Sequence, residues 1–220
     1  TLAKGLADAG VSLFNGRGVC AGPHEVRVTA ADGGEQTLSA QYIILAGGSR
    51  SASFPGLTPD HDAVLDSTDL LNIPAVPESL IIVGAGAIGL EMADFFSAMG
   101  STVTVVEAAP QLAPTEDADL ARELQKLLGK AGRACLAGAK ASSLLTRDGQ
   151  AVLTLDDGRE LTAAKALVAV GRKPNTDGLE AEKAGCGLNK RGYVTVDDYL
   201  KAAPSVFAIG DINGKTLLAH

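Results

Sequence analysis

A short unbroken apolar run at residues 80–83 gives the clearest order along the chain. It is followed at once by the glycine-rich segment 84–89 and then by residues 90–99, which have the length and composition of a helix. Residues 102–106 are apolar or β-branched, as is typical of a second strand. The pattern therefore predicts a strand, a glycine turn, a helix and a strand in succession.

Residues 115–132 carry helix signals that agree with one another. Thr115 is expected to cap the amino end, acidic residues fill the first turn, lysines lie near the other end, and Gly132 stops the helix. We expect one buried face, formed by Leu120, Leu124, Leu127 and Leu128.

Asp-Gly pairs indicate the turns of an antiparallel meander. The pairs at 148–149 and 157–158 predict hairpins, and an apolar strand at 166–170 follows. A shift of 123 positions places residues 161–163 on residues 38–40, each after an Asp-Gly turn. Two similar nucleotide-binding domains would produce this repeat, although short resemblances of this kind also arise by chance. The alternation of elements predicts an α/β fold.

Composition and charge exclude several classes of function. The formal charge of −7 and the lack of a Lys/Arg cluster argue against nucleic acid or a membrane as partner. Three widely separated cysteines fit neither a metal site nor a redox pair, and we expect them to be buried or bystander thiols in a reducing cytoplasm. No catalytic triad or paired carboxylates are evident, so neither catalytic nor metal-binding residues are predicted. The chain opens at Thr1 without a targeting peptide, and we expect it to be a piece of a longer protein.

The segment 84–89 reads GxGxxG, the pattern of a dinucleotide-binding turn. Gly84 would make the tight turn, Gly86 would let the backbone approach a pyrophosphate, and Gly89 would let the helix pack on the strand. A plain strand-helix turn is the alternative. Glu107 lies 23 residues after Gly84, near the spacing expected for the acid that accepts the adenosine ribose hydroxyls. A carboxylate there would repel a 2′-phosphate, which predicts NAD over NADP.

Four further positions have two interpretations each. Gly171 follows the last strand of the meander unit, where α/β sheets bind ligands, but it can equally be a turn glycine. Gly47 and Gly48 share this ambiguity. Asp211 is expected to cap a following helix, with binding of a polyol hydroxyl as the alternative.

With these motifs in place, the chain resembles the flavin-dependent pyridine nucleotide-disulfide oxidoreductases, and within them the dihydrolipoamide dehydrogenase branch. The segments that carry the resemblance are residues 42–50, 54–56, 79–91, 105–107, 168–175, 178–179, 182–185, 191–197, 207–211 and 218–220. The resemblance implies a Rossmann-like, three-layer NAD-binding domain with a β-meander, at residues 74–190. It would be inserted in a partial FAD-binding domain of the same type, at residues 1–73 and 191–220.

The resemblance also implies site residues. NAD contacts fall on Gly84, Gly86, Ala87, Ile88, Gly89, Glu107, Ala141 and Gly171, with Ala141 at a position usually held by valine. Glu91 is similar to a glutamate that pairs with a lysine beside the flavin. FAD contacts fall on Ala46, Gly47, Gly48, Ser49, Asp211, Ala219 and His220, with Gly47 in place of the usual threonine.

For the intact protein the resemblance implies oxidation of dihydrolipoyl groups with reduction of NAD, through FAD and a redox disulfide. Its partners would be a second copy of the chain and the lipoyl domains of 2-oxo acid dehydrogenase complexes. The redox cysteine pair lies outside this sequence, so we expect this chain alone to be inactive. The first glycine turn of the FAD-binding domain, which would hold the ADP half of the cofactor, also lies outside it, so we expect the chain to bind FAD weakly or not at all. The alternatives are an NADH oxidase, a soluble transhydrogenase or a mercuric reductase of the same fold, or a non-catalytic nucleotide-binding module.

Overall fold

The computed structural model describes residues 2–217, which form two compact units. One unit is continuous and comprises Ser51–Arg172. The other, here called the discontinuous unit, comprises the described residues up to Arg50 and from Lys173 onward. Two short strands, β5 (Ser49–Ser51) and β14 (Arg172–Pro174), pair where the chain passes between the units.

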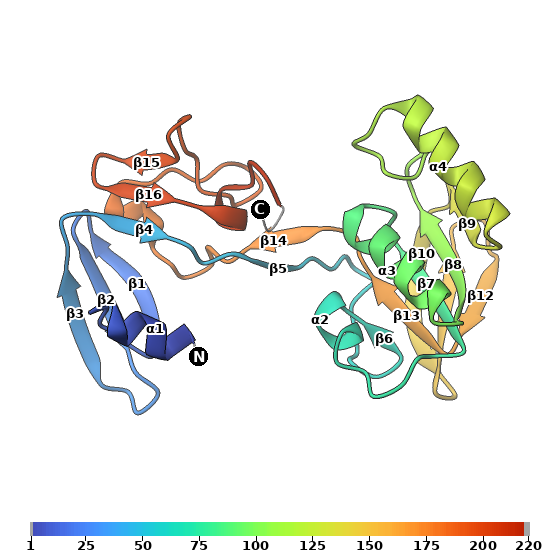
Figure 1. The fold of residues 1–220 in the computed structure, drawn as a ribbon, viewed down its shortest axis with the longest axis horizontal. Helices are drawn as coiled ribbons and strands as arrows, with labels where there is room; N and C mark the ends of the chain where they lie inside the picture. Colours follow the sequence, from blue (N-terminus) through green and yellow to red (C-terminus); the bar gives the residue numbers. More distant parts are fainter. Residues whose placement is uncertain (1, 218–220) are drawn as a thin grey trace. The chain divides into compact units, whose positions relative to one another are not determined.

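The 51–172 unit is built on a five-stranded parallel sheet in the order β6-β13-β7-β8-β9 (Figure 1). Helix α3 connects β7 to β8 and helix α4 connects β8 to β9, as in doubly wound α/β folds. The elements are β6 (Val64–Leu65), α2 (Ser67–Leu70), β7 (Ser79–Val83), α3 (Ala87–Ala98), β8 (Thr102–Glu107), α4 (Ala118–Lys130), β9 (Ala134–Ala137) and β13 (Lys165–Val168). The predicted strand-helix-strand unit is confirmed.

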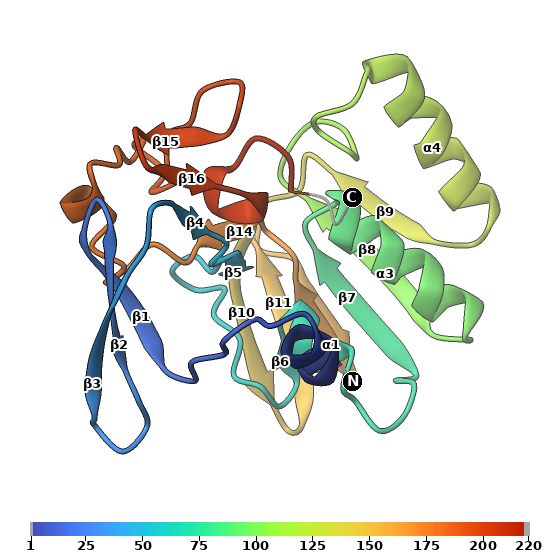
Figure 2. The same cartoon turned by 60° about the vertical axis from the view of Figure 1, so that its left-hand side comes forward.

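The other face of this sheet carries an antiparallel meander, β10 (Ala141–Arg147), β11 (Gln150–Leu155) and β12 (Glu160–Ala163). Figure 2 shows α3 and α4 on one side of the sheet and the meander strands on the other. The predicted turn between β10 and β11 is confirmed, since Asp148 and Gly149 both have positive φ, at 52° and 76°. Such a turn matches the twist of a two-stranded ribbon.

Alternate side chains of the parallel strands point to the two layers. Ile81 and Val83 of β7 lie in a core shared with Leu144 and Leu153 of the meander. Leu80 and Ile82 lie in a second core with Phe96 of α3 and Leu128 of α4. A sheet covered on both faces needs strands that are apolar at every position, which explains the unbroken run at 80–83. The α/β class and the three-layer, Rossmann-like arrangement are therefore confirmed.

Helix α4 departs from its prediction at two points. It begins at Ala118 after Asp117, so Thr115 is not its cap. Its buried residues are Ala121 and Leu128, whereas Leu120 and Leu127 are mostly exposed. Each exposed leucine precedes a buried residue by one position, which turns its side chain about 100° around the helix axis. The expected four-leucine face was thus too wide.

The discontinuous unit repeats part of this plan. An antiparallel meander is followed by a strand, β4, that pairs in parallel with β16, while β15 lies antiparallel to β16. The same succession of a meander and then a strand of a parallel pair occurs at β10–β13, as the sequence repeat predicts. Its elements are α1 (Leu2–Asp8), β1 (Arg17–Gly22), β2 (Glu25–Thr29), β3 (Glu35–Ser39), β4 (Ile43–Leu45), η1 (Ala181–Ala184), β15 (Lys201–Ala203), β16 (Val206–Ala208) and η2 (Gly210–Asn213).

The units divide at residues 50/51 and 172/173, not at the expected 73/74 and 190/191. Residues 51–73 belong with the following sheet because Val64 and Leu65 pair with β13. Residues 173–190 belong with the discontinuous unit because Ala181, Ala184 and Cys186 share its core with Cys20. Over the described residues, the structure has no helix long and apolar enough to cross a membrane.

Candidate functional site

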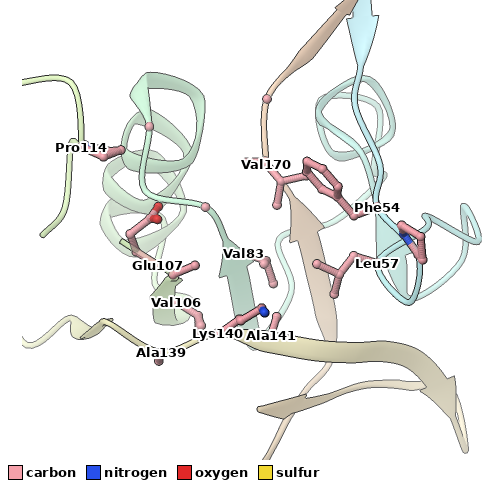
Figure 3. Close-up of a pocket in the computed structure, with 16 residues that line it drawn as sticks. Phe54, Leu57, Val83, Val106, Glu107, Pro114, Ala139, Lys140, Ala141 and Val170 are labelled. Carbon is pink, nitrogen blue, oxygen red and sulfur yellow. The ribbon is translucent and has the colours of Figure 1, made fainter. Parts of the chain in front are cut away.

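A cavity of about 540 Å³ opens at the carboxyl ends of the central strands of the 51–172 unit (Figure 3). Ligands of open α/β sheets bind at this edge. Most of the side chains around it are apolar, and the cavity is also bordered by the glycine turn after β7. Its lining residues are Phe54, Pro55, Leu57, Val83, Gly84, Gly86, Val106, Glu107, Ala108, Pro114, Ala139, Lys140, Ala141, Ala169, Val170 and Gly171.

The three glycines of the turn differ in the structural reason for having no side chain. Gly84 has φ +106°, and a Cβ there would lie 2.3 Å from the Ala169 carbonyl oxygen. A Cβ on Gly89 would lie 1.9 Å from the Gly84 carbonyl oxygen, so the helix can approach the strand only without a side chain. A Cβ on Gly86 would meet nothing within 4 Å. Protein packing therefore explains the first and third glycines, while the second leaves space beside the cavity.

Helix α3 begins at this open position. Gly86 is its N-cap residue, and no side chain caps the helix. The first amide groups of an α-helix have no partner within the helix, and its dipole places partial positive charge at this end. A helix of 12 residues whose amino end lies beside an open cavity is suited to an anionic group.

Glu107 ends β8 and lies in the cavity wall, where the sequence predicts it. Its Oε2 accepts a hydrogen bond from the Ala85 amide and its Oε1 accepts one from the Ala109 amide, both at 2.7 Å. These bonds fix the orientation of the carboxylate. A carboxylate offers about four acceptor positions, so two remain for hydroxyl donors of a ligand.

Ala141 and Gly171, two of the predicted contacts, also line the cavity. Gly171 has φ +129°, a backbone conformation that favours glycine. Phe54, Leu57 and Lys140 also line the cavity but are not among the predicted contacts. Residues 54–56 carry part of the family resemblance, but Phe54 and Leu57 lie in a proline-rich stretch without periodicity and Lys140 lies between two strands, so no local pattern indicated a ligand contact.

The other predicted contacts on α3 do not line the cavity. Ala87 is the exposed first residue of the helix, Ile88 is half-buried, and Gly89 packs against the glycine turn. Glu91 is exposed one turn further along.

The residues expected at a flavin come together within the discontinuous unit. Ser49 donates a hydrogen bond to a carboxylate oxygen of Asp211. Asp211 lies inside the short helix η2, which starts after Ile209, so the expected capping role is wrong. Gly48 has φ +65°, and a Cβ on Gly47 would lie 3.2 Å from Cδ1 of Ile212. Ala46 is exposed at the end of β4, whereas Ala219 and His220 lie outside the described residues.

The three cysteines are free thiols. Cys20 and Cys186 are buried in the core of the discontinuous unit, and burial raises the pKa of both. Burial also raises the pKa of Cys135, which is half-buried. A raised pKa keeps these sulfurs in the less reactive thiol form. Among residues 2–217, no group of three or more His, Cys, Asp or Glu side chains gathers as a metal site would require.

Curated proteins similar to the chain are named as dihydrolipoyl dehydrogenases. One from Chlorobaculum parvum is 38% identical over 220 residues, which cover 98% of this chain and 47% of that protein. One from Pseudomonas putida is 36% identical, covering 96% of this chain and 46% of its own length. A mitochondrial one from Arabidopsis thaliana is 38% identical, with coverage of 96% and 43%. The chain thus spans about half the length of the curated relatives it matches.

Solved structures share the fold over almost the whole chain. LpdA from Mycobacterium tuberculosis superimposes with a TM-score of 0.90 at 32% identity, over 99% of this chain and 49% of that one. A variant of the flavoprotein disulfide reductase RclA from Escherichia coli gives 0.89 at 31% identity, over 98% and 49%. The family model described as pyridine nucleotide-disulphide oxidoreductase matches residues 3–220. That match includes the glycine turn, Glu107 and the two repeated units, and the chain belongs to the pyridine nucleotide-disulphide oxidoreductase family.

Proposed function

We propose that the 51–172 unit binds NAD(H) in the cavity at the end of β7. The observation that carries the proposal is Gly86, whose missing side chain leaves open space beside the cavity at the uncapped end of α3. A pyrophosphate would lie against these amides, and the adenosine ribose would donate hydroxyl hydrogen bonds to Glu107. The oriented carboxylate supports NAD over NADP, because it would repel a 2′-phosphate.

Titration with NADH and NADPH tests the proposal. The chain has no Trp, so the emission of the reduced nicotinamide can be followed without overlap from tryptophan. We expect tighter binding of NADH, and equal or tighter binding of NADPH would contradict the specificity assigned to Glu107.

Gly86→Val provides the matched variant. Because a Cβ at this position would meet nothing within 4 Å, we expect an unfolding midpoint close to that of the unsubstituted chain and a loss of NADH binding of at least about tenfold. Unchanged NADH binding in a folded Gly86→Val protein would mean that the nucleotide does not approach α3.

For the intact protein we propose that FAD contacts Ala46, Gly47, Gly48, Ser49 and Asp211. The exposed backbone at the end of β4 and the hydroxyl-carboxylate pair of Ser49 and Asp211 suit a phosphate and a polyol, and the relative RclA is named as a flavoprotein. Bound flavin would supply two-electron transfer between a dithiol and the nicotinamide. We expect this chain alone to bind FAD weakly or not at all. Flavin retained after gel filtration of a mixture would contradict that expectation.

The activity we propose for the intact protein is that of a dihydrolipoyl dehydrogenase. A dihydrolipoyl dithiol would lose two electrons and two protons to become a disulfide. NAD⁺ would take up both electrons and one of these protons to become NADH, so the whole reaction releases one proton. The names of the relatives support this assignment. A second copy of the chain and lipoyl domains of 2-oxo acid dehydrogenase complexes would be its partners, and the cytoplasm its compartment.

Assays with dihydrolipoamide and NAD⁺ test the activity. The full-length protein should form NADH, and this chain alone should not, because Cys20 and Cys186 are buried and the half-buried Cys135 is a single thiol, so none of them supplies an accessible redox pair. NADH formation by this chain would refute that expectation. A full-length protein that oxidises NADH with oxygen, or with another disulfide in place of lipoamide, would replace the assignment by an oxidase or another reductase of the fold.

A further inference from the structure

Lys140 is the one cationic side chain among the described residues that line the cavity. Glu107, the one carboxylate there, is already bonded to two backbone amides. Other lysines of the chain, such as Lys165 and Lys183, pair with carboxylates, but the Lys140 ammonium has neither an ion pair nor a hydrogen bond within residues 2–217. An unpaired cation thus borders a mostly apolar cavity.

The backbone fixes where this side chain starts. The Gly138 amide donates to the Ala109 carbonyl at 2.8 Å, and the Ala139 amide donates to the Glu107 carbonyl at 2.9 Å. The Lys140 carbonyl accepts a hydrogen bond from the Asp156 amide at 2.9 Å. The lysine therefore lies one residue beyond a pair of bonds that join its segment to the end of β8.

From this base the side chain extends along the cavity. In the view of Figure 3 it runs from the 139–141 segment in the direction of Val83, the residue that precedes the glycine turn. The four methylene groups of lysine can lie on apolar surface while the ammonium stays polar and mobile. The ammonium can in this way contact a ligand that extends from Glu107 to Gly86.

A dinucleotide in this cavity brings an uncompensated charge. Its pyrophosphate carries two negative charges and would lie near the carboxylate of Glu107, while the amino end of α3 offers about half of one positive charge. We propose that Lys140 is a positioning residue that pairs with the pyrophosphate of the bound dinucleotide, an inference that rests on the NAD(H) site proposed above. Apolar surroundings strengthen such a pair relative to the open surface.

Binding of ADP-ribose, measured by calorimetry at low and at high salt, tests the proposal. The chains compared are the unsubstituted one, Lys140→Met, Lys140→Arg and the control Lys130→Met, which removes the same charge from the exposed end of α4. We expect Lys140→Met to weaken binding about three- to tenfold at low salt. The loss should shrink at high salt, and Lys140→Arg and Lys130→Met should bind almost as the unsubstituted chain does.

Two results would overturn the role proposed for Lys140 without affecting the proposed NAD(H) site. Lys140→Met could bind ADP-ribose as well as the unsubstituted chain does, which would leave the lysine a solvated bystander. The loss of affinity caused by Lys140→Met could also be the same at both salt concentrations, which would assign the effect to apolar contacts of the lysine methylene groups. If the unsubstituted chain binds neither ADP-ribose nor NADH, the proposed nucleotide site fails, and this inference fails with it.

Discussion

Gly89 is the residue at which helix α3 and strand β7 come closest. A methyl group there would lie 1.9 Å from the Gly84 carbonyl oxygen and 3.3 Å from Cγ2 of Ile82, so the backbone would have to move. We expect Gly89→Ala to lower the free energy of unfolding by about 3 kcal/mol, although alanine favours a helix more than glycine does. Urea unfolding measures the change.

Gly129 is the matched control for that substitution. It lies within α4 and is exposed, and a Cβ there would meet nothing within 4 Å. Gly129→Ala should therefore raise the free energy of unfolding by about 0.5–1 kcal/mol. If both substitutions changed stability in the same direction, the close helix-strand contact would not be the reason that Gly89 is a glycine.

At the residue scale, the sequence was informative where spacing alone determines position. Gly84, Gly89 and Glu107 lie within one strand-turn-helix-strand unit, so their places follow from its length. Lys140 and Phe54 reach the same cavity through tertiary packing of segments distant in sequence, and no local pattern could assign them to it.

His61 and Asp69 form a pH-dependent pair outside the proposed site. His61 Nδ1 lies 2.7 Å from Asp69 Oδ2, which also accepts a hydrogen bond from the Asp66 amide at the start of α2. The hydrogen bond with Asp69 and its negative charge raise the pKa of His61 above 6.5. Partial burial opposes ionisation of Asp69, but hydrogen bonds from the Asp66 amide and from His61 outweigh it and lower its pKa.

The sign of the pH dependence follows from these shifts. A raised histidine pKa in the folded state adds stability below the unfolded pKa of 6.5, and this stability is lost as the pH rises through the folded value. At about pH 6 we expect the unsubstituted chain to have a higher melting temperature than the His61→Asn variant. The difference in melting temperature should decline toward about pH 9. Asparagine suits the positive φ of 64° at this position. A melting difference that stays constant over this range would exclude the pair as its source.

At the scale of an element, helix α4 shows that neighbouring side chains in one helix can differ greatly in burial. Leu128 is 6% exposed and Leu127 is 54% exposed, although both are leucines in the same turn. Leu128→Ala should cost about 2–4 kcal/mol of unfolding free energy, because it leaves a cavity in the core between helix and sheet. Leu127→Ala should change it by less than about 0.5 kcal/mol. Similar losses from both variants in urea unfolding would show that Leu127 is covered in solution.

Most element types could be predicted, and element faces less well. The run at 80–83 and the Asp-Gly turn at 148–149 are local signals, and both gave the observed strand and hairpin. Which residues of α4 are buried depends on how the helix packs on the core beside the sheet, and apolar spacing alone does not determine that packing. The expected boundary at residues 73/74 differs from the observed one for a similar reason. Strand β6 has only two residues and is recognisable only by its pairing with β13.

At the scale of the whole molecule, the two units have separate cores. All buried residues of the two cores around the parallel sheet lie in residues 51–172, whereas the third core belongs to the discontinuous unit. A ligand that binds only the folded form of one unit stabilises that unit, by about 2.7 kcal/mol at a concentration of one hundred times Kd.

Hydrogen exchange with and without NADH therefore locates the nucleotide. We expect slower exchange in β7, β8 and the start of α3, because their amide groups surround the cavity and open only when its unit opens. Strands β4 and β16, which belong to the other core, should exchange at unchanged rates. Protection of β4 and β16 without protection of β7 would place NADH at the flavin-type residues of the discontinuous unit. Equal protection of β7 and of β4 and β16 would show that the two units open together. In that case the proposed NADH site would require that Gly86→Val abolish the protection by NADH in both units.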